Sequence, residues 1–145
     1  MTREPEPTRL FVYGSLLSGE RDHPLLSGAE HLGLASTAPE YYLVELNGFP
    51  ALVHGGKLCV VGECYRADAA LLRRLDVHKQ HPVLFQRQRL RLADGELAYT
   101  YMMTLEQVRG RRRLKSGDWR QRFGALPTER QSPWAKWARD RRSVR

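Results

Sequence analysis

The chain has 145 residues, which is the length of one ordinary domain and enough to bury a core without metals or disulfides. Its apolar share of 41% and its charged share of 28% are typical of a globular protein in water. The apolar runs are too short to cross a membrane, and the first residues lack the apolar core of a signal peptide. The sequence therefore predicts a cytoplasmic protein without membrane contact.

The net charge of +8 is concentrated at the C-terminal end. Residues 106–145 contain 13 Lys or Arg and 4 Asp or Glu, whereas residues 1–105 contain 11 and 12. Basic residues with interleaved tryptophans can contact nucleic acid. A charge run alone says little about a specific partner, so we favour a solvated tail over a nucleic-acid site.

The first half of the chain predicts short strands joined by loops. Residues 1–8 are a polar leader with two prolines, and the apolar run at 10–13 predicts a first strand. A loop rich in Gly, Asp and His at 18–28 precedes strand-like stretches at 32–46, which Pro39 interrupts.

The middle of the chain predicts two strands and one helix. A turn signal at 47–50 leads into a strand at 51–54, and a second strand is predicted at 58–65. Asp68 is placed to cap a helix over 69–77, whose leucines form one apolar stripe.

The last third predicts a hairpin and a tail. Side chains at 83–92 alternate between two faces, which predicts a strand. The turn pair Asp94-Gly95 then connects it to a final strand at 97–103. A short helix is expected at 133–139. The fold class expected is mixed α+β, with a small curved or barrel-like sheet of about six strands, one packed helix and a basic C-terminal tail. The expected divisions are a flexible leader at 1–8, a domain at 9–123 and a basic tail at 124–145.

The two cysteines do not suggest a crosslink or a metal site. Cys59 and Cys64 are five positions apart, which places them on opposite faces if both lie on one strand. A disulfide between them is then not expected. No cysteine or histidine pair has zinc-site spacing, so we expect buried thiols and no metal.

The stretch Tyr13-Gly14-Ser15-Leu16-Leu17 directly follows the first predicted strand. A Gly-Ser pair at a strand end opens the backbone and leaves N–H groups unpaired. Such groups can cradle a carboxylate or another small anion. An ordinary turn remains the alternative explanation for this short pattern.

The segment Tyr13-Gly14-Ser15-Leu16 resembles the signature of the gamma-glutamylcyclotransferase-like family. Further stretches that resemble this family follow in the expected order over residues 9–123, and the last is similar to a tail motif of a short bacterial branch. They are Gly62-Glu63-Cys64-Tyr65, Leu75-Asp76, Phe85-Gln86-Arg87 and Ser116-Gly117-Asp118-Trp119. We take Arg87, which matches the family's arginine, to be structural.

The resemblance implies a cofactor-independent reaction in which a gamma-glutamyl amine or peptide closes on itself to 5-oxoproline and a free amine. The α-carboxylate of the substrate would be held by the backbone N–H groups of Gly14, Ser15, Leu16 and Leu17. A positioned general base would contribute about 10²- to 10⁴-fold to the rate. Tyr13 and Tyr65 lie beside two of these motifs, and they could pack in the core, form a pocket wall whose hydroxyls orient the substrate, or do both.

The residue expected to be the base is different in this chain. Active members resemble Leu-Asp-x-x-Glu, whereas this sequence reads Leu75-Asp76-Val77-His78-Lys79. An ammonium at Lys79 cannot take a proton unless burial lowers its pKa by several units, and it would repel the substrate's α-ammonium. The sequence therefore predicts weak or no activity on ordinary gamma-glutamyl amines.

Three routes could restore function, and each has a structural alternative. His78 or His81 could act as the base, or they could be solvated. Glu63 could point into the pocket, or it could be a paired structural carboxylate. Lys79 could favour an anionic substrate, or it could lie on the surface. The sequence leaves two functions open: a cyclotransferase acting on a gamma-glutamyl amine or similar small amide, and a non-catalytic binder that kept the pocket.

Overall fold

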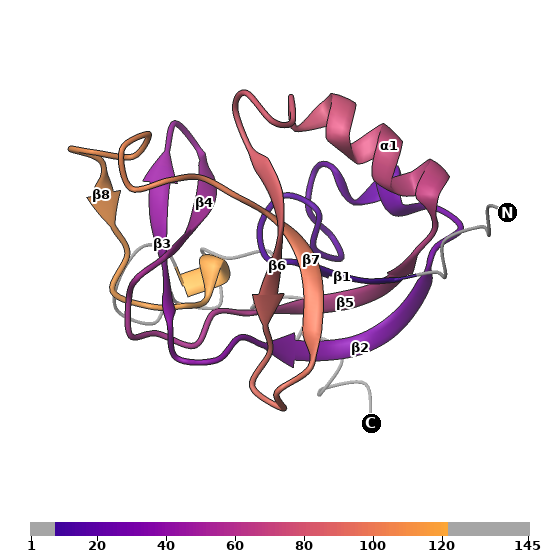
Figure 1. Cartoon of the computed structure of the whole chain (residues 1–145), viewed down its shortest axis with the longest axis horizontal. Coiled ribbons are helices and arrows are strands. Elements are labelled where there is room, and N and C mark those ends of the chain that lie inside the picture. The colour runs from indigo at the N-terminus through magenta and orange to yellow at the C-terminus, as the bar shows by residue number, and fades with distance from the viewer. Residues whose placement is uncertain (1–7, 122–145) are drawn as a thin grey trace, which may run out of the picture.

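The computed structural model describes residues 8–121 as one curled sheet with a single α-helix packed against it (Figure 1). The predicted mixed α+β class is confirmed. The sheet within these residues has eight strands, whereas the sequence predicted about six. Residues 30–46 form two separate strands, and residues 112–113 form a further short strand. The predictions for residues 1–7 and 122–145, including the tail helix, lie outside the described residues.

The elements alternate short strands with one helix, as the sequence predicted. The helix α1 is Ala69–His78, and two 3₁₀ turns lie at His23–Leu26 (η1) and Trp119–Gln121 (η2). The strands are β1 Thr8–Val12, β2 Glu30–Ser36, β3 Tyr41–Leu46, β4 Phe49–His54, β5 Val61–Ala67, β6 Gln86–Arg91, β7 Leu97–Met102 and β8 Arg112–Arg113.

Strand β7 is the point where the sheet branches. The sheet order is β2-β5-β1-β7-β4-β3-β8, and β6 pairs with the other edge of β7. Both β1 and β4 run parallel to β7, but β1 pairs at Tyr99 and β4 at Met102. Residues 100–101 of β7 therefore lie where β1 and β4 separate, and the chain leaving β1 passes beside this gap.

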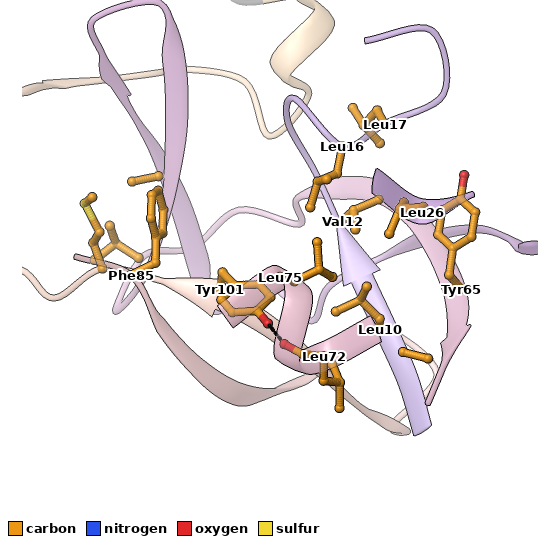
Figure 2. Close-up of a cluster of buried hydrophobic side chains, with 14 of the residues drawn as sticks. Leu10, Val12, Leu16, Leu17, Leu26, Tyr65, Leu72, Leu75, Phe85 and Tyr101 are labelled. Atoms are coloured by element: carbon orange, nitrogen blue, oxygen red, sulfur yellow. Dashed lines mark hydrogen bonds between the residues drawn. The ribbon is translucent and has the colours of Figure 1, made fainter. Parts of the chain in front are cut away.

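Helix α1 begins and packs as its sequence pattern predicts. The Asp68 side chain accepts a hydrogen bond from the Leu71 N–H at 2.8 Å, which caps the helix. Leu71, Leu72 and Leu75 are buried in one hydrophobic cluster, and Figure 2 shows Leu72 and Leu75. This cluster continues into β1 through Leu10 and Val12, and into the chain after β1 through Leu16 and Leu17. The core therefore anchors both the loop after β1 and the helix that precedes Lys79.

Both cysteines are free, as predicted, but the expectation that both thiols are buried is wrong for Cys59. Strand β5 begins at Val61, so Cys59 lies outside it and is exposed, whereas Cys64 is buried. The segment before β5 pairs elsewhere, because Leu58 bridges to Tyr41. In the part of the chain that the structure describes, no helix is long and apolar enough to span a membrane.

Candidate functional site

A small pocket opens at the end of β1, in the gap between β1 and β4. It brings Lys79 together with the loop residues Tyr13, Gly14, Ser15 and Leu16. The other lining residues are Phe11, Val12, Phe49, Pro50, Thr100 and Tyr101. Of the other residues predicted for the site, Leu17, Glu63, Tyr65 and His78 do not line this pocket.

The loop after β1 presents backbone donors for which the described residues provide no acceptor. The fold of the loop is fixed by Leu17 N–H donating to Gly14 O at 3.0 Å and Asp22 N–H donating to Ser15 O at 2.8 Å. Within residues 8–121, the N–H groups of Gly14, Ser15 and Leu16 have no hydrogen-bond acceptor. Adjacent free N–H groups of this kind suit a carboxylate.

Gly14 is required by packing in the pocket wall. A Cβ atom at this position would lie 2.5 Å from Pro50 Cγ and 2.9 Å from Pro50 Cδ. The absence of a side chain therefore allows β4 to approach the loop. Leu17 contributes differently, because its side chain is buried in the core.

Lys79 reaches the pocket from the C-terminal end of α1. It is the C-cap residue of the helix, and its Nζ lies 4.8 Å from the centroid of the Phe85 ring. Burial lowers the pKa of Lys79 to about 8, although the Asp22 carboxylate acts in the opposite direction. On the order of a tenth of the side chains are then neutral at pH 7. A neutral amine can accept a proton.

Asp22 does not line the pocket, but its charge acts on Lys79, and the sequence reasoning missed it. Burial acts to raise its pKa, but a hydrogen bond from the Ser15 side chain and the charges of His78 and Arg21 hold the pKa below its usual value. Its Oδ2 lies 3.4 Å from His78 Nε2. His78 is therefore paired with Asp22. The sequence placed Asp22 in a loop rich in polar residues, and no motif marked it.

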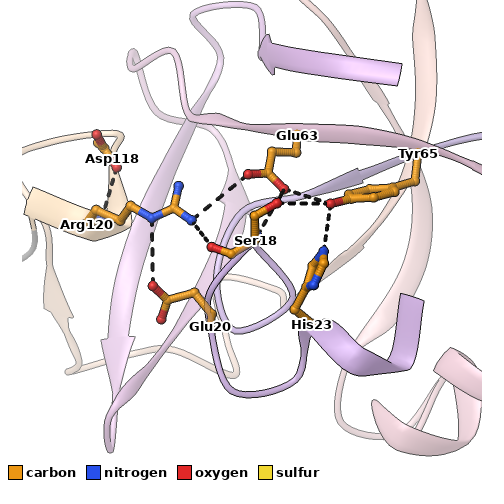
Figure 3. A network of polar contacts seen from close by, with 7 residues as sticks. All are labelled: Ser18, Glu20, His23, Glu63, Tyr65, Asp118 and Arg120. Atoms are coloured by element: carbon orange, nitrogen blue, oxygen red, sulfur yellow. Dashed lines mark hydrogen bonds and ion pairs between the residues drawn. The ribbon is translucent and has the colours of Figure 1, made fainter. Parts of the chain in front are cut away.

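Glu63 lies in a polar network beneath the loop (Figure 3). Its Oε1 accepts hydrogen bonds from Ser18 N–H at 3.0 Å, Ser18 Oγ at 2.9 Å and the Tyr65 hydroxyl at 2.9 Å. Its Oε2 lies 4.0 Å from an Arg120 nitrogen. The Tyr65 hydroxyl also contacts His23 Nε2 at 2.9 Å. These groups hold the Ser18 turn against β5.

The tyrosines of the pocket wall have their hydroxyls committed to the protein. The Tyr13 hydroxyl donates to Tyr101 O at 2.6 Å and accepts from Leu52 N–H at 3.2 Å, and burial raises its pKa. The Tyr101 hydroxyl donates to Asp76 at 2.6 Å. Asp76 also holds Arg87 through two contacts of 3.0 and 3.2 Å. Arg87 therefore contacts another residue of the protein, Asp76.

His81 is occupied at the start of the strand that follows the helix. Its Nδ1 accepts a hydrogen bond from Arg87 N–H at 3.0 Å. Like His78, it does not line the pocket. Among the bases considered from the sequence, Lys79 is the one that lines the pocket together with Gly14, Ser15 and Leu16.

The fold is that of the AIG2-like proteins. The family model described as gamma-glutamyl cyclotransferase, AIG2-like, matches residues 10–121, and the chain belongs to this family. A putative gamma-glutamylcyclotransferase from Vibrio cholerae is 38% identical over 113 residues, which is 78% of this chain and 96% of the relative. A gamma-glutamylaminecyclotransferase from Rattus norvegicus is 34% identical over 93 residues, 57% of this chain and 62% of the relative.

Solved structures agree with this assignment. An AIG2-like protein from Mus musculus has a TM-score of 0.61 and 28% identity, covering 68% of this chain and 78% of the other. A uropathogenic E. coli-specific protein has a TM-score of 0.70 over 88% of this chain and 100% of the other. At 24% identity, the second likeness shows the fold alone.

Proposed function

We propose that the protein is a gamma-glutamyl cyclotransferase-type enzyme that acts on a gamma-glutamyl amine or a similar small amide and releases 5-oxoproline. In this proposal the neutral amine of Lys79 is the general base. The observation that carries it is that Lys79 lines the same pocket as Gly14, Ser15 and Leu16, whose N–H groups have no acceptor within residues 8–121. The rat relative's name supports an amine as the leaving group.

The reaction follows from these groups. The substrate α-carboxylate binds to the free N–H groups of the loop, and Lys79 takes a proton from the substrate's α-ammonium. The freed amine attacks the γ-carbonyl carbon and forms the ring C–N bond. The Lys79 ammonium returns its proton to the leaving nitrogen as the C–N bond to that nitrogen breaks. The neutral Lys79 then takes the second proton from the ring nitrogen and passes it to the departing amine, which leaves as an ammonium. No other reactant is needed for this sequence.

The lowered pKa makes Lys79 a reasonable base. At a pKa of about 8, Lys79 is a stronger base than a carboxylate of ordinary pKa, roughly 4. Transfer of the substrate's α-ammonium proton to Lys79 therefore costs about 5 kcal/mol less than transfer to such a carboxylate. The limitation is the fraction of Lys79 that is neutral. We therefore expect weak turnover at neutral pH and an increase as the pH rises through about 8.

The test is release of 5-oxoproline from a gamma-glutamyl amine, measured from neutral to alkaline pH. Lys79→Met keeps the length of the side chain but removes the amine, and it should lower kcat by about 10²-fold or more. Lys79→Glu should remove the rise of kcat toward alkaline pH, because a carboxylate is already ionised. Lys57→Met removes an exposed lysine outside the pocket and should leave kcat unchanged.

Two results would contradict the proposal. The first is a Lys79→Met variant that turns over as fast as the parent, which would assign the base to another group. The second is a parent that binds gamma-glutamyl amines with no turnover at any of these pH values. That outcome would favour the non-catalytic binder.

A further inference from the structure

A second and larger groove lies between α1 and the hairpin of β6 and β7. Its volume is about 460 Å³, within the usual range of small-ligand sites. It shares no lining residue with the pocket that contains Lys79. Its apolar floor includes Ala67, Leu72 and Ala98, and Ala69 lies at its α1 edge.

Three arginines from two elements line this groove. Arg73 comes from α1, and Arg87 and Arg89 come from one face of β6. The guanidinium carbon of Arg87 lies 5.2 Å from the centroid of the Tyr99 ring, and that of Arg89 lies 5.8 Å from it. This contact orients both side chains over the same aromatic surface.

The positive charge in the groove is only partly compensated. Arg87 is paired with Asp76. Within residues 8–121, Arg73 and Arg89 make no ion pair, and the lining residues include no acidic side chain. Like charges that converge on one volume without a counter-charge favour binding of an anion there.

We propose that this groove binds a small organic phosphate, with Arg73 and Arg89 on the phosphate oxygens and the organic part on the apolar floor. The planar guanidinium group matches phosphate geometry and remains charged at any relevant pH. The combination of an apolar floor with arginines at the edges is what an amphipathic ligand requires. This site is independent of the proposed cyclotransferase activity.

The dimensions favour a small ligand over nucleic acid. A nucleic acid is usually bound along an extended basic surface that follows its backbone. Here the arginines face one volume of ligand size, bounded by α1 on one side and by β6 on the other. We therefore assign the groove to a phosphate-bearing small molecule.

The test is calorimetric titration of the full chain with ADP and with inorganic pyrophosphate at low ionic strength. We expect saturable binding of one molecule per chain that weakens as salt is added. Arg73→Ala and Arg89→Ala should each weaken binding roughly tenfold or more, because each removes charge-assisted hydrogen bonds. Arg111→Ala removes the same charge at an exposed position outside the groove and should have little effect.

A neighbouring pair of alanines gives a matched control. Ala69→Glu places a carboxylate in the groove at the first turn of α1, where a negative charge is compatible with the helix. It should abolish binding. Ala70→Glu makes the same change one residue later, at an exposed position that does not line the groove, and should preserve binding.

Three outcomes would overturn the proposal. One is that neither ADP nor pyrophosphate binds saturably. Another is that Arg111→Ala or Ala70→Glu weakens binding as much as the groove variants do, which would indicate attraction by net charge alone. The third is that a single-stranded oligonucleotide binds more tightly than ADP and depends equally on Arg73 and Arg89, which would assign the groove to nucleic acid.

Discussion

The two sides of the loop after β1 use their polar groups in opposite ways. Beneath the loop, Glu63 Oε1 accepts three hydrogen bonds, two of them from Ser18. On the pocket side, the N–H groups of Gly14, Ser15 and Leu16 have no acceptor within residues 8–121. A satisfied buried network stabilises the fold, whereas unused donors in a pocket are available to a ligand. The same loop is therefore held on one side and open on the other.

Among the variants that test this comparison, we expect the loss of Glu63 to have the largest effect. Glu63→Ala leaves the Ser18 and Tyr65 donors without their acceptor and should lower the free energy of unfolding by about 3 kcal/mol. Urea denaturation measures it. Glu30→Ala breaks an exposed pair with Arg66 and should cost less than about 1 kcal/mol. Equal costs for the two variants would mean that the network does not anchor the loop.

Gly14 tests whether the pocket side is constrained by packing. Gly14→Ala places a methyl group against Pro50 and should lower the free energy of unfolding by about 1–3 kcal/mol. Pro50→Ala should remove most of this clash, so the two substitutions should be strongly non-additive in a double-mutant cycle. Additive costs would show that Pro50 is not what excludes a side chain at position 14.

The ionisation of Lys79 gives a pH-dependent stability. Its pKa is about 8 in the folded protein against an ordinary 10.5, so between these values the unfolded chain binds more protons. The free energy of unfolding should therefore rise with pH across this interval by more in the parent than in Lys79→Met. Matching slopes for the two proteins, measured by urea denaturation at several pH values, would mean that the pKa is not lowered.

Asp22 should shift the same ionisation. Its carboxylate stabilises the Lys79 ammonium, so Asp22→Asn should lower the pKa of Lys79 further and move the rise of kcat to lower pH. The pH dependence of 5-oxoproline release measures this shift. Asp118→Asn removes a carboxylate outside the pocket and should leave the profile in place. A shift toward higher pH after Asp22→Asn would contradict this electrostatic role.

The sequence predicted what local chemistry determines. The Asp68 cap, the leucine stripe of α1 and the break after β1 are all encoded within a few residues. The network of Glu63 could not be predicted, because Ser18 is 45 residues away from it. The pKa of Lys79 likewise depends on burial and on Asp22, and neither is visible in a motif.

Some motif residues serve packing and not chemistry. Position 62 requires glycine, because a Cβ atom there would collide with the Val12 carbonyl oxygen. Gly117 similarly faces the carbonyl oxygen of Cys59. A family signature therefore mixes residues that bind with residues that let strands approach, and only the arrangement in space separates them.

The smallest effect that we expect is that of Tyr13→Phe. The Tyr13 hydroxyl lies in the pocket region but bonds to Tyr101 O and Leu52 N–H, so it belongs to the held side of the comparison. Its removal should lower the free energy of unfolding by about 1 kcal/mol and leave KM unchanged within about twofold. Tyr99→Phe removes a hydroxyl without a hydrogen bond in residues 8–121 and should be close to neutral. A large rise in KM for Tyr13→Phe would instead place this hydroxyl on the substrate, as the sequence suggested.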